Sequence, residues 1–279
     1  MTQKCRVKKP ECREPIPASH RTSFMPDIDH RLAVAVRIVH EAARSALELF
    51  DARGRFALEE KGAREYVSEA DRMIERRIRE ALAIDLSEDD VMGEEMGGEG
   101  SNAFWAIDPI DGTANFLRGS PLWGVSLGFV EDDEPVVGVI AYPSLGVTLS
   151  AARGRGVSRN GQSFERNIDF PSVHLAAVGD NARWPATEIA QVEYALRTSG
   201  WGLAEYRCAT IGLGFAALGF VDGYLEKHTS IWDIAAGSVI CREAGLGVHA
   251  HGTYDGGGQT IFAGTDALHA VVDRHLSRS

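Results

Sequence analysis

The sequence has few cysteines, and none of them belongs to a metal-binding or redox motif. The chain contains Cys5, Cys12, Cys208 and Cys241, which form no Cys-x-x-Cys pair, and no cysteine and histidine cluster has zinc-site spacing. We therefore interpret these residues as reduced thiols, which are typical of a cytoplasmic protein.

Long apolar runs are also absent, and basic residues are in the minority. No segment has the length of a membrane span, and the N-terminus has no apolar signal-peptide core. The 29 Lys and Arg residues face 40 Asp and Glu residues, giving a formal net charge of −11. This charge argues against unaided binding to nucleic acid or to an anionic membrane surface. An anionic ligand would need local positive charge, which bound metal ions could supply.

What remains is the composition of a globular protein, preceded by a short arm. The 279 residues are 44% hydrophobic and 25% charged, enough for one large core or two moderate ones. Residues 1–28 differ because they combine six basic residues with Pro10, Pro15, Pro17 and Pro26 and show no periodicity. We expect this basic, proline-rich arm to be disordered or to lie over the surface.

The rest of the chain has the patterns of alternating helices and strands. Helical spacing of apolar residues predicts helices over 28–50 and 69–84, and apolar runs predict strands at 66–67, 91–93, 104–107, 123–130, 135–142 and 147–152. Asn160-Gly161 predicts a hairpin turn within 154–161. The second half predicts strands at 174–178, 204–206, 223–226, 246–249 and 260–263, between helices at 186–198, 211–218, 231–244 and 266–276. Interleaved strands and helices indicate a layered α/β fold.

The most informative stretch is Asp108-Pro109-Ile110-Asp111-Gly112-Thr113, which follows the predicted strand at 104–107. Pro109 cannot donate to a sheet, so we expect it to end the strand and to leave both carboxylates at the strand's carboxyl end. Gly112 and Thr113 can open a helix, whose free N–H groups attract anions. Carboxylate oxygens together with a phosphate are the ligands that Mg²⁺ prefers.

This stretch resembles a signature of the inositol monophosphatase family of Mg²⁺-dependent, often Li⁺-sensitive phosphatases. Three further family motifs follow the family's order: Ser68-Glu69-Ala70-Asp71, Gly93-Glu94-Glu95 and Trp232-Asp233-Ile234-Ala235-Ala236-Gly237. The resemblance extends from about Asp29 to the C-terminus. It implies one catalytic domain over 29–279 with a five-layer α-β-α-β-α sandwich, in which 29–170 form a metal and phosphate half and 171–279 a substrate half.

The resemblance also implies a set of metal ligands for two to three Mg²⁺ ions. Glu94, Asp108 and the Ile110 carbonyl would hold the first ion. Asp108, Asp111 and Asp233 would hold the second, and a third, weaker ion would lie near Glu94, largely through water. From the residues alone, Asp111 could cap the following helix, instead of or besides ligating, and Asp233 could be a first-turn acid favoured by the helix dipole. Glu95 could support the metal ligands without binding metal, or it could be solvated. Ala235-Ala236-Gly237 indicate tight packing beneath a fixed Asp233.

For the reaction, the resemblance implies hydrolysis by a metal-activated water. Asp71 and the Thr113 hydroxyl would orient this water, while the Gly112 and Thr113 amides would bind phosphate and Asp111 would serve the leaving oxygen. Asp71 could alternatively be an exposed helical acid. No covalent phosphoenzyme is required.

The substrate expected from the resemblance is inositol 1-phosphate. Glu226 lies seven residues before Asp233, where inositol-hydrolysing members carry a Glu that accepts hydrogen bonds from ring hydroxyls. An exposed strand-end Glu is the alternative. Ala209 lies in Arg207-Cys208-Ala209-Thr210, which replaces the family's usual Gly-Ser/Thr-Ala substrate loop.

Other readings of the function stay open. They are the same hydrolysis on histidinol phosphate, a sugar bisphosphate or a 3′-phosphorylated nucleotide, or a catalytically idle relative retained for binding. The family resemblance further implies a homodimer.

Overall fold

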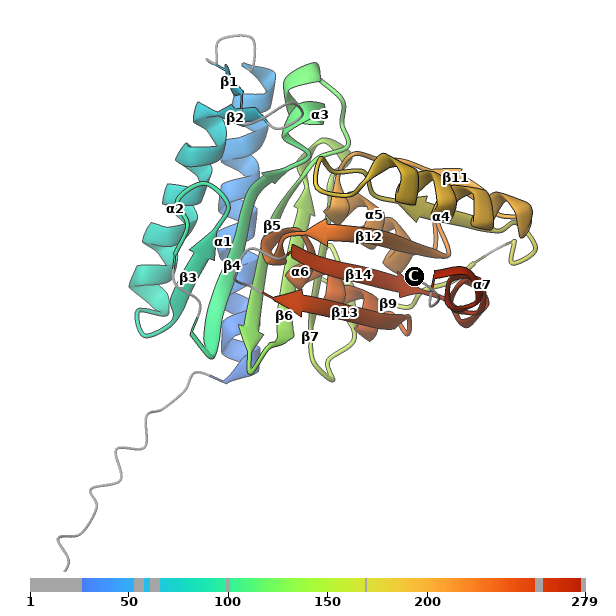
Figure 1. Ribbon diagram of the computed structural model, residues 1–279. Helices are drawn as coiled ribbons and strands as arrows, with labels where there is room; N and C mark the ends of the chain where they lie inside the picture. The colour runs from blue at the N-terminus through green and yellow to red at the C-terminus, as the bar shows by residue number, and fades with distance from the viewer. Residues whose placement is uncertain are drawn as a thin grey trace, which may run out of the picture.

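The computed structural model describes residues 27–52, 58–60, 66–98, 101–168, 170–253 and 258–276. The predicted arm at 1–28 therefore lies almost entirely outside the described residues. Two helices, a seven-stranded sheet, two central helices, a five-stranded sheet and two outer helices follow one another in space (Figure 1). The predicted α-β-α-β-α sandwich is thus confirmed. No helix among these residues combines the length and apolar character needed to cross a bilayer.

The first layer contains α1 (Ile28–Asp51) and α2 (Glu69–Asp85), both amphipathic as their apolar spacing predicts. They cover one face of a sheet whose strands lie in the order β3 (Asp90–Gly93), β4 (Ala103–Asp111), β5 (Gly124–Glu131), β6 (Glu134–Tyr142), β7 (Val147–Ala152), β8 (Val157–Arg159) and β9 (Gln162–Phe164). β3 is parallel to β4 and the other neighbours are antiparallel. Separately, β1 (Leu58–Glu60) pairs with β2 (Tyr66–Ser68).

Side-chain alternation along the sheet divides the core between its two faces. On β4, Trp105 and Ile107 pack with α1 and α2, whereas Phe104 and Ala106 pack with the central helices. The 3₁₀ turn η2 (Pro143–Leu145) connects β6 to β7, and a tight hairpin connects β8 to β9. Asn160 and Gly161 have φ angles of 52° and 79°, so the predicted hairpin turn is confirmed.

The expectation that Pro109 ends the strand is wrong. β4 continues to Asp111, which pairs with Gly124 of β5, and the ladder is irregular between Asp108 and Asp111. Because proline lacks an N–H, it interrupts the hydrogen bonds to β5 without stopping the extended backbone. The short helix α3 (Thr113–Arg118) follows after Gly112, whose φ is 84°.

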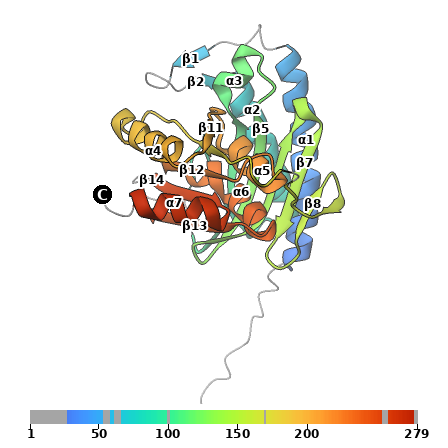
Figure 2. The same cartoon turned by 90° about the vertical axis from the view of Figure 1, so that its right-hand side faces the viewer.

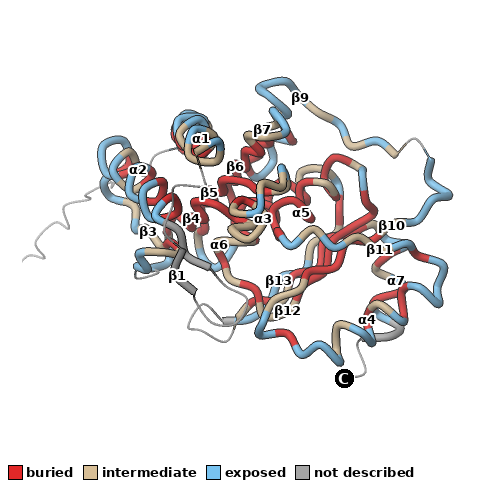
Figure 3. The backbone as a smooth tube through the Cα atoms, turned by 90° about the horizontal axis from the view of Figure 1, so that it is seen from above, coloured by how far each residue is buried: buried red, intermediate tan, exposed pale blue. Residues whose placement is uncertain are grey.

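The central layer contains α5 (Ala209–Leu218) and α6 (Ile231–Glu243), which separate the two sheets. The second sheet has the strand order β11 (Gly202–Ala204), β10 (Leu175–Val178), β12 (Gly223–Thr229), β14 (Gly258–Gly264) and β13 (Gly247–Thr253), with β10 parallel to both neighbours. The outer helices α4 (Ala186–Thr198) and α7 (Asp266–Leu276) cover its far face (Figure 2). Buried backbone is concentrated in the strands and the central helices (Figure 3).

One predicted strand of this sheet is displaced. The prediction placed it at 204–206, but β11 ends at Ala204. Tyr206 leaves the sheet, and its ring lies 5.2 Å from that of Phe215 on α5. Buried Trp201 anchors the chain just before the strand, so pairing with β10 begins at Gly202.

Helix α6 lies unusually close to the seven-stranded sheet. A Cβ at Gly138 would lie 2.3 Å from the Ala236 carbonyl oxygen, and one at Gly128 would lie 2.8 Å from the Ala235 Cβ. Ala235 and Ala236 are completely buried. The predicted tight packing is confirmed, and it fixes the first turn of α6, which carries Asp233.

Candidate active site

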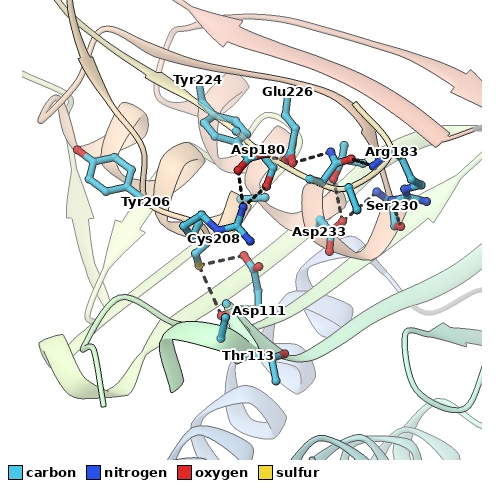
Figure 4. Close-up of a pocket in the computed structure, with 18 of the residues that line it drawn as sticks. Asp111, Thr113, Asp180, Arg183, Tyr206, Cys208, Tyr224, Glu226, Ser230 and Asp233 are labelled. Atoms are coloured by element: carbon cyan, nitrogen blue, oxygen red, sulfur yellow. Dashed lines mark hydrogen bonds and ion pairs between the residues drawn. The ribbon is translucent and has the colours of Figure 1, made fainter. Parts of the chain in front are cut away.

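A polar pocket lies where the carboxyl end of β4 meets the N-terminal ends of α3, α5 and α6 and the loops after β10 and β12 (Figure 4). Its lining includes Asp111, Thr113, Glu226 and Asp233. The N-terminus of a helix carries partial positive charge and free N–H groups, so their convergence favours an anionic ligand.

Three carboxylates from two elements come together at one side of this pocket. One oxygen from each of Asp108, Asp111 and Asp233 lies within 4.8 Å of the others. Asp108 is 1% exposed, and its Oδ1 accepts the Ile110 N–H at 3.1 Å. β4 and α6 are far apart in the sequence, but α6 packs against β5 and β6 and so brings Asp233 close to the end of β4.

Burial is the largest cause of the raised pKa values of the carboxylates in this cluster. It raises the pKa of Asp108 well above its ordinary value, and the charges of Glu94, Asp111, Asp233 and Asp71 raise that pKa further. Burial and the charge of Asp233 raise the pKa of Asp111 to about 6, against the opposing hydrogen bonds from Thr210 and Cys208. The pKa of Asp233 is also raised by burial. Buried oxygen ligands that resist ionisation without a cation match the chemistry of a hard divalent metal site.

Asp111 does not cap α3. Its Oδ2 accepts the Thr210 N–H, in the first turn of α5, at 2.6 Å and lies 3.1 Å from the thiol of Cys208, the N-cap residue of that helix. Gly112 occupies the N-cap of α3 without a side-chain cap bond. The hypothesis that Asp111 caps α3 is therefore wrong. The carboxylate instead connects the end of β4 to the start of α5.

Asp233 is the predicted first-turn acid of α6 and is also a member of the carboxylate cluster. Its Oδ2 accepts the Ser230 N–H at 2.9 Å and the Thr229 hydroxyl at 2.8 Å, which caps α6. The same carboxylate supplies an oxygen to the cluster with Asp108 and Asp111.

Asp71, on α2, and Glu94, directly after β3, border this cluster. Glu94 lines the pocket, and its N–H donates to the Ile107 carbonyl at 3.2 Å. Asp71 is 1% exposed, so the reading of it as an exposed helical acid is wrong. The neighbouring Glu95 side chain is 4% exposed and lies 4.0 Å from Arg72 Nε, so Glu95 is not solvated.

The Thr113 hydroxyl is joined directly to another predicted site residue. It donates to the Ile110 carbonyl oxygen at 3.1 Å. Thr113 and Gly112 both line the pocket at the start of α3.

On the opposite side of the pocket, Glu226 is 6% exposed, so the reading as an exposed strand-end Glu is wrong. The Tyr224 hydroxyl donates to its Oε2 at 2.6 Å, and the Asn181 amide donates to its Oε1 at 2.9 Å. Burial raises the pKa of Glu226 to about 7 despite the hydrogen bonds from Asn181 and Tyr224, which lower it, and the charges of Asp233 and Asp111 add smaller increases. Ala209, the first residue of α5, lines the pocket between the two sides.

The structure adds pocket residues that the sequence reasoning missed. The Arg183 Nη2 donates to the Ser230 hydroxyl at 2.9 Å, and Arg207 pairs with Asp180 at 2.6 Å. Together with Asn181, these side chains lie near the ends of parallel strands β10 and β12 or in the loop before α5. Gly179-Asp180-Asn181 directly follows a predicted strand, and ligands bind at the carboxyl ends of parallel strands. The position of this segment in the sequence therefore favoured a place in the site.

Comparisons with known proteins agree with this geometry. The sequence profile of the inositol monophosphatase family matches residues 27–274. The chain is 34% identical over 220 residues to the fructose-1,6-bisphosphatase/inositol-1-monophosphatase of Aquifex aeolicus, covering 77% of this chain and 83% of the relative. It is 35% identical over 199 residues to the histidinol-phosphatase of Mycobacterium tuberculosis, covering 64% and 72%. The crystal structure of the extragenic suppressor protein suhB of Bartonella henselae superposes with a TM-score of 0.79 at 28% identity, covering 89% of this chain and 99% of that one.

Proposed function

This chain belongs to the inositol monophosphatase family and is a phosphatase acting on phosphomonoesters, and we propose that its substrate is inositol 1-phosphate, which it hydrolyses to myo-inositol and phosphate. The observation that carries the choice of a polyol is the buried Glu226 carboxylate, which faces the same pocket as the acidic cluster. A carboxylate offers about four lone-pair sites, so the two hydrogen bonds from Tyr224 and Asn181 leave acceptors for adjacent ring hydroxyls.

The acidic cluster fits a group of bound Mg²⁺ ions. We propose that Glu94, Asp108, the Ile110 carbonyl, Asp111 and Asp233 hold two to three of them. Support comes from the donor chemistry, because the buried Asp108 and Asp111 and the half-buried Asp233 converge within 4.8 Å and their pKa values are raised. When bound, the ions supply positive charge to the phosphate and lower the pKa of a water molecule.

The protein's own groups have complementary tasks in this proposal. The Gly112 and Thr113 N–H groups at the start of α3 bind phosphate oxygens. Thr113 Oγ1 donates to the Ile110 carbonyl and so keeps its lone pairs for a hydrogen bond from the attacking water, whose proton Asp71 helps to direct. Asp111 would lie on the side of the leaving oxygen and help to supply its proton.

A sugar bisphosphate is the second candidate substrate, and Arg183 favours it. Its guanidinium lines the pocket and donates to a neutral hydroxyl, that of Ser230, so its charge is available to a second phosphate. Arg207 is less suited because Asp180 pairs with it at 2.6 Å. The name of the Aquifex aeolicus relative includes both activities.

The remaining proposals follow from the family resemblance. We propose a homodimer located in the cytoplasm and inhibited by Li⁺. We also propose that residues 29–170 form the metal and phosphate half of one catalytic domain, and residues 171–279 the substrate half.

The test is phosphate release with Mg²⁺ from inositol 1-phosphate, fructose 1,6-bisphosphate, histidinol phosphate and 3′-phosphoadenosine. We expect the highest kcat/KM for inositol 1-phosphate. Asp108→Asn should lower all rates by roughly 10³-fold, because several kcal/mol of charge stabilisation are lost. A higher kcat/KM for fructose 1,6-bisphosphate would favour the second candidate. Rates from the wild type that match Asp108→Asn on every substrate would instead support a binding protein.

A further inference from the structure

The turn that carries Glu94 is held by a buried acid on a neighbouring helix. Glu75 lies on α2, one turn after Asp71, and is 0% exposed. Residues four apart on a helix share a face, so α2 directs both acids toward β3 and β4. We propose that Glu75 is a positioning residue that keeps Glu94 turned toward the Asp108 cluster and thereby sets the affinity for a divalent cation. This inference rests on the proposed role of Glu94 as a metal ligand.

Both oxygens of Glu75 are used to fix the backbone after β3. Oε2 accepts the Glu95 N–H at 2.7 Å, and Oε1 accepts the Met96 N–H at 3.2 Å. These amides immediately follow Glu94, and the Glu94 N–H itself donates to the Ile107 carbonyl on β4. Three successive amides are thus hydrogen-bonded, which restricts the backbone that carries the Glu94 side chain.

Arg79 completes this clamp and neutralises it. Its Nε donates to Glu75 Oε1 at 2.7 Å, and its remaining guanidinium nitrogens donate to the Val91 carbonyl and the Gly97 carbonyl. The turn closes on itself because Gly93 and Gly97 exchange backbone hydrogen bonds of 2.9 and 3.0 Å. The guanidinium therefore bridges the strand before Glu94 and the residue that ends the turn.

The glycine of the Gly93-Glu94-Glu95 motif is explained by the same contact. A Cβ at Gly93 would lie 2.2 Å from Glu75 Oε1 and 3.0 Å from Arg79 Nη2. A side chain there would expel the carboxylate that holds the turn. The motif is thus one part of a two-part device, and the other part lies on α2.

The decisive variant is Glu75→Gln, which keeps the shape of the side chain. Its amide group can accept with only one oxygen and presents N–H groups to the amides or the guanidinium that Glu75 now serves. Residues that support a metal ligand typically cost 10- to 100-fold in metal affinity when changed. Glu80→Gln is the matched control because Glu80 is exposed on the same helix.

The experiment measures binding of Mn²⁺, as a paramagnetic probe for Mg²⁺, to the full chain by electron paramagnetic resonance. We expect Glu75→Gln to weaken binding about 10-fold or more and to raise the Mg²⁺ concentration needed for half-maximal activity, with kcat recovering at saturating Mg²⁺. Glu80→Gln should stay within about twofold of the wild type. If Glu75→Gln does not fold, as judged by near-ultraviolet circular dichroism, Arg79→Lys should still weaken Mn²⁺ binding about threefold.

The outcomes separate this inference from the function on which it rests. Unchanged Mn²⁺ affinity in the folded Glu75→Gln variant, with binding lost in Asp108→Asn, would refute the role of Glu75 alone. Unchanged affinity in both variants would refute the metal site itself, and the role of Glu75 with it.

Discussion

The pocket has two walls that are built in different ways. The carboxylate wall comprises Glu94, Asp111 and Thr113, which line the pocket, together with Asp108 of the acidic cluster, and these residues lie at the ends of β3 and β4 or directly after them. It is fixed largely by backbone groups, such as the Ile110 and Thr210 amides and the Ile110 carbonyl. The substrate wall comprises Asn181, Arg183, Tyr224 and Glu226. Besides bonds between Asn181 and the backbone, it contains hydrogen bonds between side chains, from Tyr224 and Asn181 to Glu226 and from Arg183 to Ser230.

This difference separates chemistry from selectivity. A side chain held by backbone amides cannot be exchanged without changing the turn that presents it. A network of side chains can be altered one member at a time. We therefore expect changes in the carboxylate wall to affect every substrate, and changes in the substrate wall to change the substrate ranking.

The largest difference between the walls should appear in how divalent cations and pH together affect the stability of the protein. Folding raises the pKa of Asp111 from 3.8 to about 6 and that of Glu226 from 4.5 to about 7, so the folded state binds more protons in that range. The free energy of unfolding of the metal-free protein should therefore fall as the pH rises from about 4 to 7, by roughly 3 kcal/mol for each group.

Thermal unfolding with EDTA or with excess Mg²⁺ checks this difference. Bound cation offsets the charge of the carboxylate wall, so the increase in Tm caused by Mg²⁺ should be larger at about pH 7.5 than at about pH 5. Both Asp111→Asn and Glu226→Gln should flatten the pH dependence of Tm in EDTA. Asp111→Asn should also remove the increase in Tm caused by Mg²⁺, whereas Glu226→Gln should leave that increase in place. A pH-independent Tm in EDTA would contradict the electrostatic account.

On the substrate wall, Glu226→Ala should lower kcat/KM for inositol 1-phosphate by about 10- to 100-fold, because hydrogen bonds to a charged group are lost and Tyr224 and Asn181 lose their acceptor. The rate for a simple aryl phosphate should change much less. Steady-state kinetics on both substrates measure this ratio, with the exposed Glu165→Ala as the control. An unchanged substrate ranking would remove Glu226 from the role assigned to it.

Two glycines give a smaller but cleaner comparison. Gly138→Ala would place a Cβ 2.3 Å from a backbone oxygen of α6, and should reduce the free energy of unfolding by about 1–3 kcal/mol. Gly179→Ala would place a Cβ 2.5 Å from Glu226 Cδ, a side chain that can move. It should cost less stability and raise KM for inositol 1-phosphate. Urea unfolding and kinetics distinguish the two, and equal stability losses would contradict the view that the substrate wall is adaptable.

The sequence predicts the carboxylate wall better than the substrate wall for a physical reason. Glu94, Asp108, Asp111 and Asp233 each lie in a short segment whose local geometry and chemistry coincide, so a motif of a few residues identifies them. Asn181 is 45 residues from Glu226, its partner, and Arg183 is 47 residues from Ser230. Such contacts depend on the register of β10 against β12, which no local pattern encodes.

The same distinction applies to the fold. The long amphipathic helix was predicted at 28–50 and extends over Ile28–Asp51, because a hydrophobic stripe repeats over many turns. The three residues of β11 have no such repeat, and only the pairing with β10 places them. The prediction at Pro109 was wrong because proline removes one hydrogen-bond donor but still permits an extended backbone.

Helix α6 rests directly on the glycines of β5 and β6, and on its other side a Cβ at Gly237 would lie 2.5 Å from Leu213 of α5. These close contacts on two sides of α6 oppose sliding of the helix between the two sheets. We therefore expect the distance between the acidic cluster and Glu226 to change little on binding, so that the length of a phosphate ester would contribute to its selection under the proposed function.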